Sequence, residues 1–168
     1  MSNASANTPL SADDYISLLQ FYQRYAETLD LGAWDEWPEF FTEECVYKVQ
    51  PRENFDRKLP LATISFESRG MLKDRVYCIR ETLYYEPYFQ RHVVGAPVVT
   101  SVQHGVVSAH ASYAVFRTKP DDVTHVYNVG RYMDTLVRAP QTAHGWQLTS
   151  RNCVFDSDLI LNSMIYPI

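Results

Sequence analysis

Eight side chains of this sequence have the chemical types that acid–base catalysis uses. A carboxylate base paired with a tyrosine or histidine proton donor is the arrangement that many isomerases and dehydratases place in a cavity. Each residue also has a structural interpretation, because aspartates flank helix ends and tyrosines fill cores while their hydroxyl finds a partner. No short spacing brings the eight together, so catalysis by this chain is the secondary interpretation. The candidates are Asp30, Asp35, Tyr25, Tyr47, His92, His110, Tyr113 and Arg131.

The histidines and cysteines do not follow a metal-binding spacing. No histidine pair stands at HxH or HExxH spacing, and no cysteine belongs to a CxxC or CxH motif. The cysteines are far apart in apolar surroundings, which favours buried reduced thiols over disulfides or an iron–sulfur cluster. We therefore expect no metal and no cofactor in this chain. The residues in question are His92, His104, His110, His125 and His144, with Cys45, Cys78 and Cys153.

Composition excludes several other classes of protein. The 168 residues are 46% hydrophobic and 14% aromatic, which fits one globular domain. The net charge of -5 argues against a nucleic-acid partner, which would need a basic surface. No apolar run approaches the roughly 20 residues of a membrane span. The glycines stand singly and no GxSxG motif occurs, so neither a phosphate loop nor a nucleophile elbow is expected. These features predict a cytoplasmic protein.

The first half of the chain is predicted to be mostly helical. Residues 1–10 are small and polar, and we expect a flexible arm before a single domain at 11–168. Apolar residues at three- and four-residue spacing predict a helix from Ser11 to about Gly32. A short helix at 33–41, a strand at 45–50, a polar loop at 52–60 and a strand at 61–67 should follow. A helix is then expected at 71–85, with Met71, Ile79 and Leu83 facing the core and Pro87 ending it.

The second half is predicted to be a sheet. Turn signals separate four long runs of β-type residues, at 91–102, 106–117, 124–137 and 146–155. Helices followed by such a meander predict an α+β fold, in which the N-terminal helices pack on a strongly curved, mostly antiparallel sheet. A sheet folded over helices in this way forms a cone with a cavity.

The charged and aromatic run at 80–92, RETLYYEPYFQRH, has two interpretations. Tyrosine and arginine are the residues enriched at the energetic centres of protein interfaces, so the run could dock a partner. Alternatively, it is a solvated helix end with aromatic rings packed beneath it. The residues that we expect at a subunit interface are Tyr84, Tyr85, Tyr88, Arg91 and His92.

Three segments carry a resemblance to a known family. They are FYQRYAETLDLGAWDEWPEFFTEECVY, ESRGMLKDRVYCIRETLYYEPYFQRH and RNCVFDSDLILNSMIYPI. With Leu29-Asp30, Arg69-Gly70 and Arg91-His92 at their habitual places, the chain resembles the small (beta) subunit of aromatic-ring-hydroxylating dioxygenases. Through VYKVQPRENFDRKLPLA and SRGMLKDRV it is most similar to the small subunits of salicylate and related hydroxybenzoate or aminobenzoate hydroxylases.

The resemblance implies a cone of the nuclear transport factor two-like type and a structural role without catalytic residues. It also implies assembly with a catalytic alpha subunit, commonly as three alpha and three beta chains. In such enzymes the alpha subunit carries a Rieske iron–sulfur cluster and a mononuclear iron, and a reductase, with or without a ferredoxin, supplies electrons from NADH or NADPH. The alternatives are a standalone isomerase or dehydratase using Asp30 with His92, and a small-ligand-binding protein of the same fold.

Overall fold

The computed structural model describes residues 10–160 and 163–168, so nearly all of the expected N-terminal arm lies outside the described residues. Helix α1 (Ala12–Asp30) begins as predicted, because the Ser11 side chain accepts a hydrogen bond from the backbone N–H of Asp14 at 3.1 Å. Most of its predicted apolar face is buried, including Leu18, Tyr22 and Tyr25, and Phe21 is buried in addition. Gly32 follows the helix with φ of +66°, a left-handed conformation that favours glycine.

The next elements differ in detail from the prediction. The short helix is a 3₁₀ turn, η1 (Trp37–Phe40), with Pro38 in its first turn. Strand β1 (Phe41–Pro51) begins earlier than expected, and the predicted polar loop contains a short helix, α2 (Arg52–Asp56). Strand β2 (Ile64–Phe66) lies within the expected 61–67 segment. The pairing of β1 with its neighbouring strand already includes Phe41, and the register shifts at a bulge between Phe41 and Val46.

The predicted helix at 71–85 is shorter and irregular. It consists of α3 (Arg69–Tyr77), capped by the Ser68 side chain, and a π-helical turn, η2 (Cys78–Thr82). The backbone is extended at Leu83, several residues before Pro87. Met71 was expected in the core but is 40% exposed, whereas Leu72 next to it is buried. The register of the buried face is therefore set by Leu72, Val76 and Ile79.

One sheet contains all the strands of the described residues. Besides β1 and β2 these are β3 (Phe89–Val94), β4 (Val98–Gln103), β5 (Val106–Thr118), β6 (His125–Ala139) and β7 (Gly145–Phe155). Their order is β2-β1-β7-β6-β5-β3, with β4 also paired to β5. The expected strand at 91–102 is two strands, separated by residues 95–97, which belong to neither. Most pairs are antiparallel, but β1 runs parallel to β7, which was not predicted. At Gly130, β6 and β7 approach so closely that a Cβ atom would lie 2.0 Å from the Val154 carbonyl oxygen.

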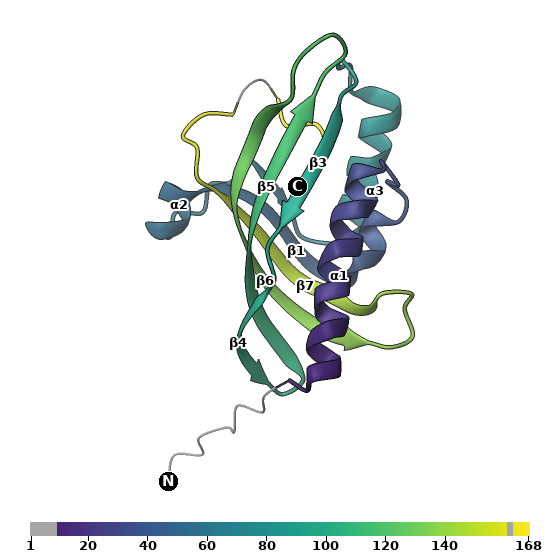
Figure 1. The fold of residues 1–168 in the computed structure, drawn as a ribbon, viewed down its shortest axis with the longest axis vertical. Coiled ribbons are helices and arrows are strands. Elements are labelled where there is room, and N and C mark those ends of the chain that lie inside the picture. Colours follow the sequence, from purple (N-terminus) through teal and green to yellow (C-terminus); the bar gives the residue numbers. More distant parts are fainter. Residues whose placement is uncertain (1–9, 161–162) are drawn as a thin grey trace.

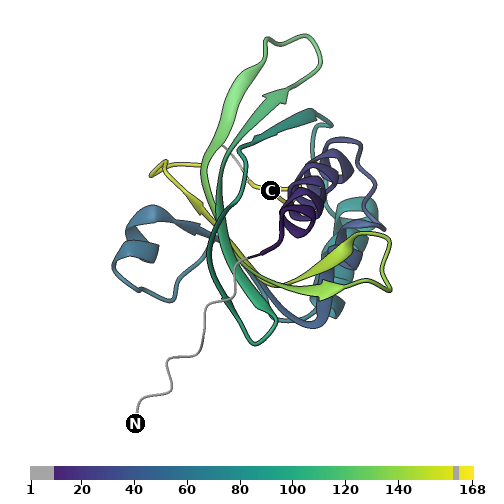
Figure 2. The same cartoon turned by 60° about the horizontal axis from the view of Figure 1, so that its bottom comes forward.

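The sheet curves around α1, which lies inside its concave face (Figure 1). Turning the molecule shows the C-terminal end of the chain inside the same curve, beside α1 (Figure 2). Aromatic rings fill the space between helix and sheet. Tyr25 packs edge-on against Phe40, and Trp37 against Tyr47, with ring centres 5.3 Å apart in both pairs. This arrangement confirms the α+β cone predicted from the order of elements.

Candidate functional site

Asp30 and His92 are brought together inside the cone. Asp30 ends α1 and His92 lies on β3, and the Oδ1 atom of Asp30 is 2.6 Å from the Nδ1 atom of His92. The backbone N–H of His92 also donates to the same carboxylate, at 3.0 and 3.1 Å. The His92 side chain is fully buried and that of Asp30 is 4% exposed. The carboxylate therefore holds the imidazole in one orientation and ties β3 to the end of α1.

This pair has the geometry of a catalytic base, but of its two members only Asp30 borders a surface pocket. The Nε2 atom of His92 is buried and has no hydrogen-bond partner among the described residues. Asp30 lines a pocket of about 330 Å³, whereas His92 lines neither this pocket nor two others of about 520 and 550 Å³. A general base must reach the proton that it removes, directly or through one water molecule. The geometry therefore favours a positioning role for Asp30 and His92.

A second buried charge pair joins β6 to β7, and the sequence analysis missed it. The Nε and Nη2 atoms of Arg151 donate to the two carboxylate oxygens of Asp134 at 2.9 and 2.7 Å, and neither side chain is exposed. The Tyr22 hydroxyl donates to the same carboxylate at 2.5 Å. The Arg151 guanidinium lies 4.1 Å from the ring centres of both Tyr25 and Tyr132. Its charge is thus enclosed by one carboxylate and aromatic faces.

Burial fixes the protonation states of this cluster. Desolvation raises the pKa of Tyr22 well above its usual value, and the negative charge of Asp134 adds to the shift. Burial is the largest single influence on the pKa of Arg151 and lowers it, but the charge and hydrogen bonds of Asp134, with smaller contributions from Tyr25 and Tyr22, together raise it above its usual value. The phenol therefore stays protonated and the guanidinium stays charged at every physiological pH. Such a pair is suited to holding strands in register rather than to transferring protons.

The chain's own C-terminal residues fill the interior of the cone. Ile168 is fully buried, and its carbonyl oxygen accepts hydrogen bonds from the hydroxyls of Tyr25 and Tyr47, each at 3.1 Å. The backbone N–H of Ile168 donates back to the Tyr47 hydroxyl at 2.9 Å. Gln90 donates to the Pro167 carbonyl at 3.4 Å. Two tyrosines that were candidate proton donors are therefore occupied by the backbone of this segment.

The remaining candidates do not join a common site. Asp35 forms an ion pair with Arg80 at the surface, with contacts of 2.7 and 2.9 Å. Tyr113 donates to the side chain of Asn128 at 2.7 Å. His110 and Arg131 alternate with buried residues of their strands and so lie on the opposite, convex face of the sheet.

Histidines and cysteines are dispersed through the structure. In residues 10–160 and 163–168, no group of three or more His, Cys, Asp or Glu side chains is placed to hold a metal ion. The three cysteines are free thiols. Nor is any helix within the described chain long and apolar enough to cross a membrane.

The three thiols should differ in reactivity. Burial raises the pKa of Cys45 to about 11 and that of Cys153 to about 12, so little thiolate forms at pH 8. Cys78 is only partly buried. Titration of the native chain with a chromogenic disulfide at pH 8 should modify one thiol rapidly, and all three should react in guanidinium chloride. Rapid reaction of two or more native thiols would contradict this placement.

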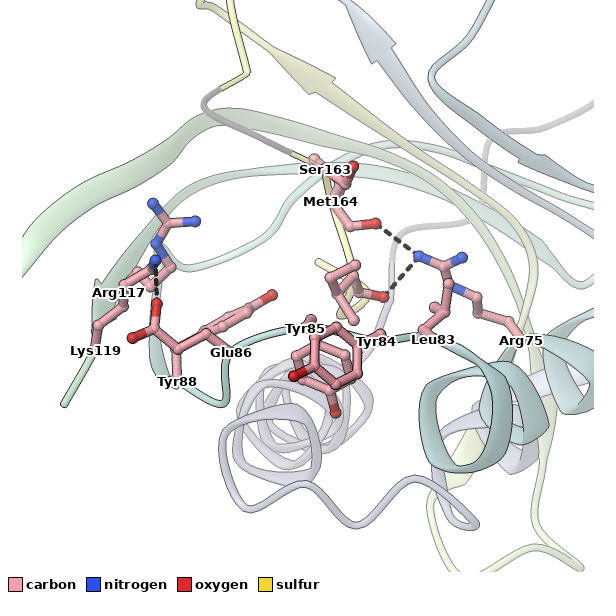
Figure 3. Close-up of a pocket in the computed structure, with 11 residues that line it drawn as sticks. Arg75, Leu83, Tyr84, Tyr85, Glu86, Tyr88, Arg117, Lys119, Ser163 and Met164 are labelled. Atoms are coloured by element: carbon pink, nitrogen blue, oxygen red, sulfur yellow. Dashed lines mark hydrogen bonds and ion pairs between the residues drawn. The ribbon is translucent and has the colours of Figure 1, made fainter.

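A pocket of about 520 Å³ lies beside the C-terminal segment, between the loop after η2 and the end of β5. Arg117 and Lys119 stand at one side and Arg75 at the other, with Tyr84 and Tyr85 between them (Figure 3). We refer to it as the Tyr–Arg pocket. Its lining residues are Arg75, Leu83, Tyr84, Tyr85, Glu86, Tyr88, Arg117, Lys119, Ser163, Met164 and Ile165.

The five residues expected at a subunit interface divide into three groups. Tyr84, Tyr85 and Tyr88 line the Tyr–Arg pocket, and the Tyr84 side chain is fully exposed. Arg91 is 74% exposed and contacts Asp30 at 3.5 Å. His92 does not present its side chain at the surface, because strand alternation points it inward to Asp30. The first four residues can contact a partner directly, whereas His92 can act only by holding β3.

The interior of the cone is filled by its own side chains, and tyrosines and arginines are exposed on its surface. These are features of a scaffold that binds other proteins. Comparison with known proteins identifies the family. Residues 24–162 match the family model described as ring hydroxylating beta subunit.

Individual relatives agree with that match. The chain is 29% identical to the anthranilate 1,2-dioxygenase small subunit of Burkholderia cepacia, over 92% of this chain and 94% of that one. It is 32% identical to a terephthalate 1,2-dioxygenase terminal oxygenase component subunit (beta 2) of Comamonas sp., over 91% and 97%. A solved structure from Novosphingobium aromaticivorans, described as the beta subunit of an aromatic-ring-hydroxylating dioxygenase, is 36% identical, with a TM-score of 0.82 over 92% and 96%.

The chain belongs to the family of ring-hydroxylating dioxygenase beta subunits. These small subunits are components of oxidoreductase complexes, and the cone has the nuclear transport factor two-like fold that the sequence resemblance implied. The resemblance to the beta-subunit family is thereby confirmed. The narrower similarity to salicylate hydroxylases remains a prediction.

Proposed function

We propose that this chain is the non-catalytic structural subunit of a multicomponent oxygenase that hydroxylates a substituted benzoate such as salicylate. The observation that carries the proposal is the filled interior of a beta-subunit cone, in which the hydroxyls of Tyr25 and Tyr47 are hydrogen-bonded to the carbonyl oxygen of Ile168. The relatives act on anthranilate and terephthalate, as their names state, and both compounds are benzoates with a second substituent. Salicylate shares with anthranilate a polar group next to the carboxylate.

In this proposal the chemistry takes place in the alpha subunit. The Rieske cluster and the mononuclear iron belong there, with electrons supplied from NADH or NADPH by a reductase, with or without a ferredoxin. The donor set of the beta chain supports this division, because Cys45 and Cys153 are buried apart and His92 is engaged by Asp30. The beta chain holds three alpha and three beta chains in a hexamer, so that electrons can pass between neighbouring alpha subunits.

The docking surface in this proposal consists of Tyr84, Tyr85, Tyr88 and Arg91, with His92 holding the strand beneath it. Tyr85 and Tyr88 are themselves fixed by Tyr166, whose hydroxyl donates to Tyr85 at 3.2 Å and whose backbone N–H donates to Tyr88 at 3.3 Å. Aromatic rings held in place in this way lose little further entropy when a partner binds.

Alanine at Tyr88 together with Arg91 should weaken hexamer assembly by at least about tenfold, because a tyrosine or arginine at the centre of an interface typically contributes more than 1 kcal/mol. Size-exclusion chromatography of the chain co-expressed with its large subunit measures this, across a dilution series. The control is alanine at Arg57, an exposed residue just after α2 that forms an ion pair with Glu53. Unchanged assembly of the Tyr88 and Arg91 double variant would show that the surface lies elsewhere.

A further inference from the structure

The Tyr–Arg pocket is positively charged on a negatively charged protein. Three cations line it, Arg75, Arg117 and Lys119, against the single carboxylate of Glu86. The whole chain carries a net charge of -5. A cluster of cations on an otherwise acidic protein creates a local positive potential, which attracts anionic groups.

Two of the three cations are already engaged within the chain. Lys119 binds Glu86 at 2.5 Å, and the Nη2 atom of Arg75 donates to the carbonyl oxygens of Met164 and Ile165 at 2.6 and 2.8 Å. Arg117 is different. Across the described residues, its guanidinium has no hydrogen-bond acceptor and no ion-pair partner.

Arg117 is instead held by aromatic rings. Its guanidinium carbon lies 4.4 Å from the ring centre of Tyr127 and 5.6 Å from that of Tyr88. Stacking of this kind orients the guanidinium plane while its N–H edges stay free to donate. A carboxylate matches such an edge with two parallel hydrogen bonds.

We propose that the Tyr–Arg pocket receives an acidic side chain of the large subunit, whose carboxylate pairs with Arg117 while its backbone packs against Tyr84. This inference rests on the proposed function and identifies the chemical group by which the docking surface recognises its partner. The neighbouring Lys119 adds positive charge, although Glu86 offsets part of it.

The shape of the pocket favours a protein segment over a small aromatic carboxylate. Sites for small molecules usually enclose roughly 70–90% of the ligand surface. Here Tyr84 stands wholly in solvent at the edge of the pocket, and it is large enough to cover a segment that approaches from outside. Tyr84, Tyr85 and Tyr88 also belong to the proposed docking surface, so one partner can contact the surface and fill the pocket.

The test measures the affinity of the large subunit for three versions of this chain. Arg117→Glu should weaken binding by at least about 30-fold, because it replaces attraction with repulsion at a hydrogen-bonded charge pair. Arg117→Lys keeps the charge but cannot form the two parallel bonds, so it should recover part of the affinity. Arg57→Glu makes the same charge change at an exposed site just after α2 and should leave binding unchanged. Circular dichroism of each variant confirms folding.

Each result has a distinct meaning. If the unmodified chain fails to bind the large subunit, the proposed function is wrong. If it binds and both Arg117 variants bind equally well, the pocket is not the recognition site. Benzoate is the probe for the competing occupant, added to the isolated chain while tyrosine fluorescence is followed. Saturable binding of benzoate that Arg117→Glu abolishes, without an effect on assembly, would also overturn the proposal.

Discussion

Asp134→Ala should lower the free energy of unfolding of the isolated chain by about 3–5 kcal/mol, because removing one partner leaves an uncompensated buried charge. Arg151 would keep its charge in an interior without exposure, and the Tyr22 hydroxyl would lose its acceptor. Urea unfolding followed by tryptophan fluorescence measures the change through the transition midpoint.

Asp35→Ala is the matched control for this variant. Asp35 forms an equally bidentate pair with Arg80, at 2.7 and 2.9 Å, but its side chain is 76% exposed. Water replaces the lost interaction there, so the midpoint should barely move. A triple replacement, Asp134→Leu with Arg151→Met and Tyr22→Phe, should recover most of the stability lost by Asp134→Ala. Equal effects of Asp134→Ala and Asp35→Ala would show that burial does not set the strength of this pair.

Local patterns were sufficient to predict most of the helices and strands. The spacing of Leu18, Tyr22, Tyr25 and Leu29 predicted α1, and Ser11 predicted its start. The run of β-type residues at 106–117 predicted β5, along which buried and less buried residues alternate. These signals depend on neighbours within one turn or one strand, and the chain carries that information directly.

Long-range pairing could not be predicted in the same way. The parallel contact of β1 with β7 joins residues about a hundred positions apart, and no short motif specifies it. The Asp134–Arg151 pair depends on the register of β6 against β7. A signal did exist, because Asp134 stands at two-residue spacing between Tyr132 and Leu136 and so shares the buried face of their strand. A charge in such a position requires a buried partner.

The Asp30–His92 pair illustrates how a site can be predicted correctly in geometry and still leave function open. Asp30 and His92 were predicted as a possible base and donor, and in the structure the Oδ1 atom of Asp30 lies 2.6 Å from the Nδ1 atom of His92. Asp30 borders one pocket with a side chain that is only 4% exposed, and His92 is fully buried and lines none of the pockets described above, so the imidazole is not accessible to a substrate. Proximity of catalytic residue types is therefore insufficient evidence for catalysis in this fold.

Ring hydroxylation should depend on this chain as a scaffold and not as a source of catalytic groups. The most direct measurement compares iron content and salicylate turnover for the large subunit alone, for this chain alone and for the two co-expressed, with NADH and the electron-supplying reductase added to each assay. We expect the co-expressed pair to form one brown, iron-containing complex with turnover, and this chain alone to be colourless and inactive. Conversion of an aromatic substrate by this chain alone, or its failure to associate with the large subunit, would contradict the structural role.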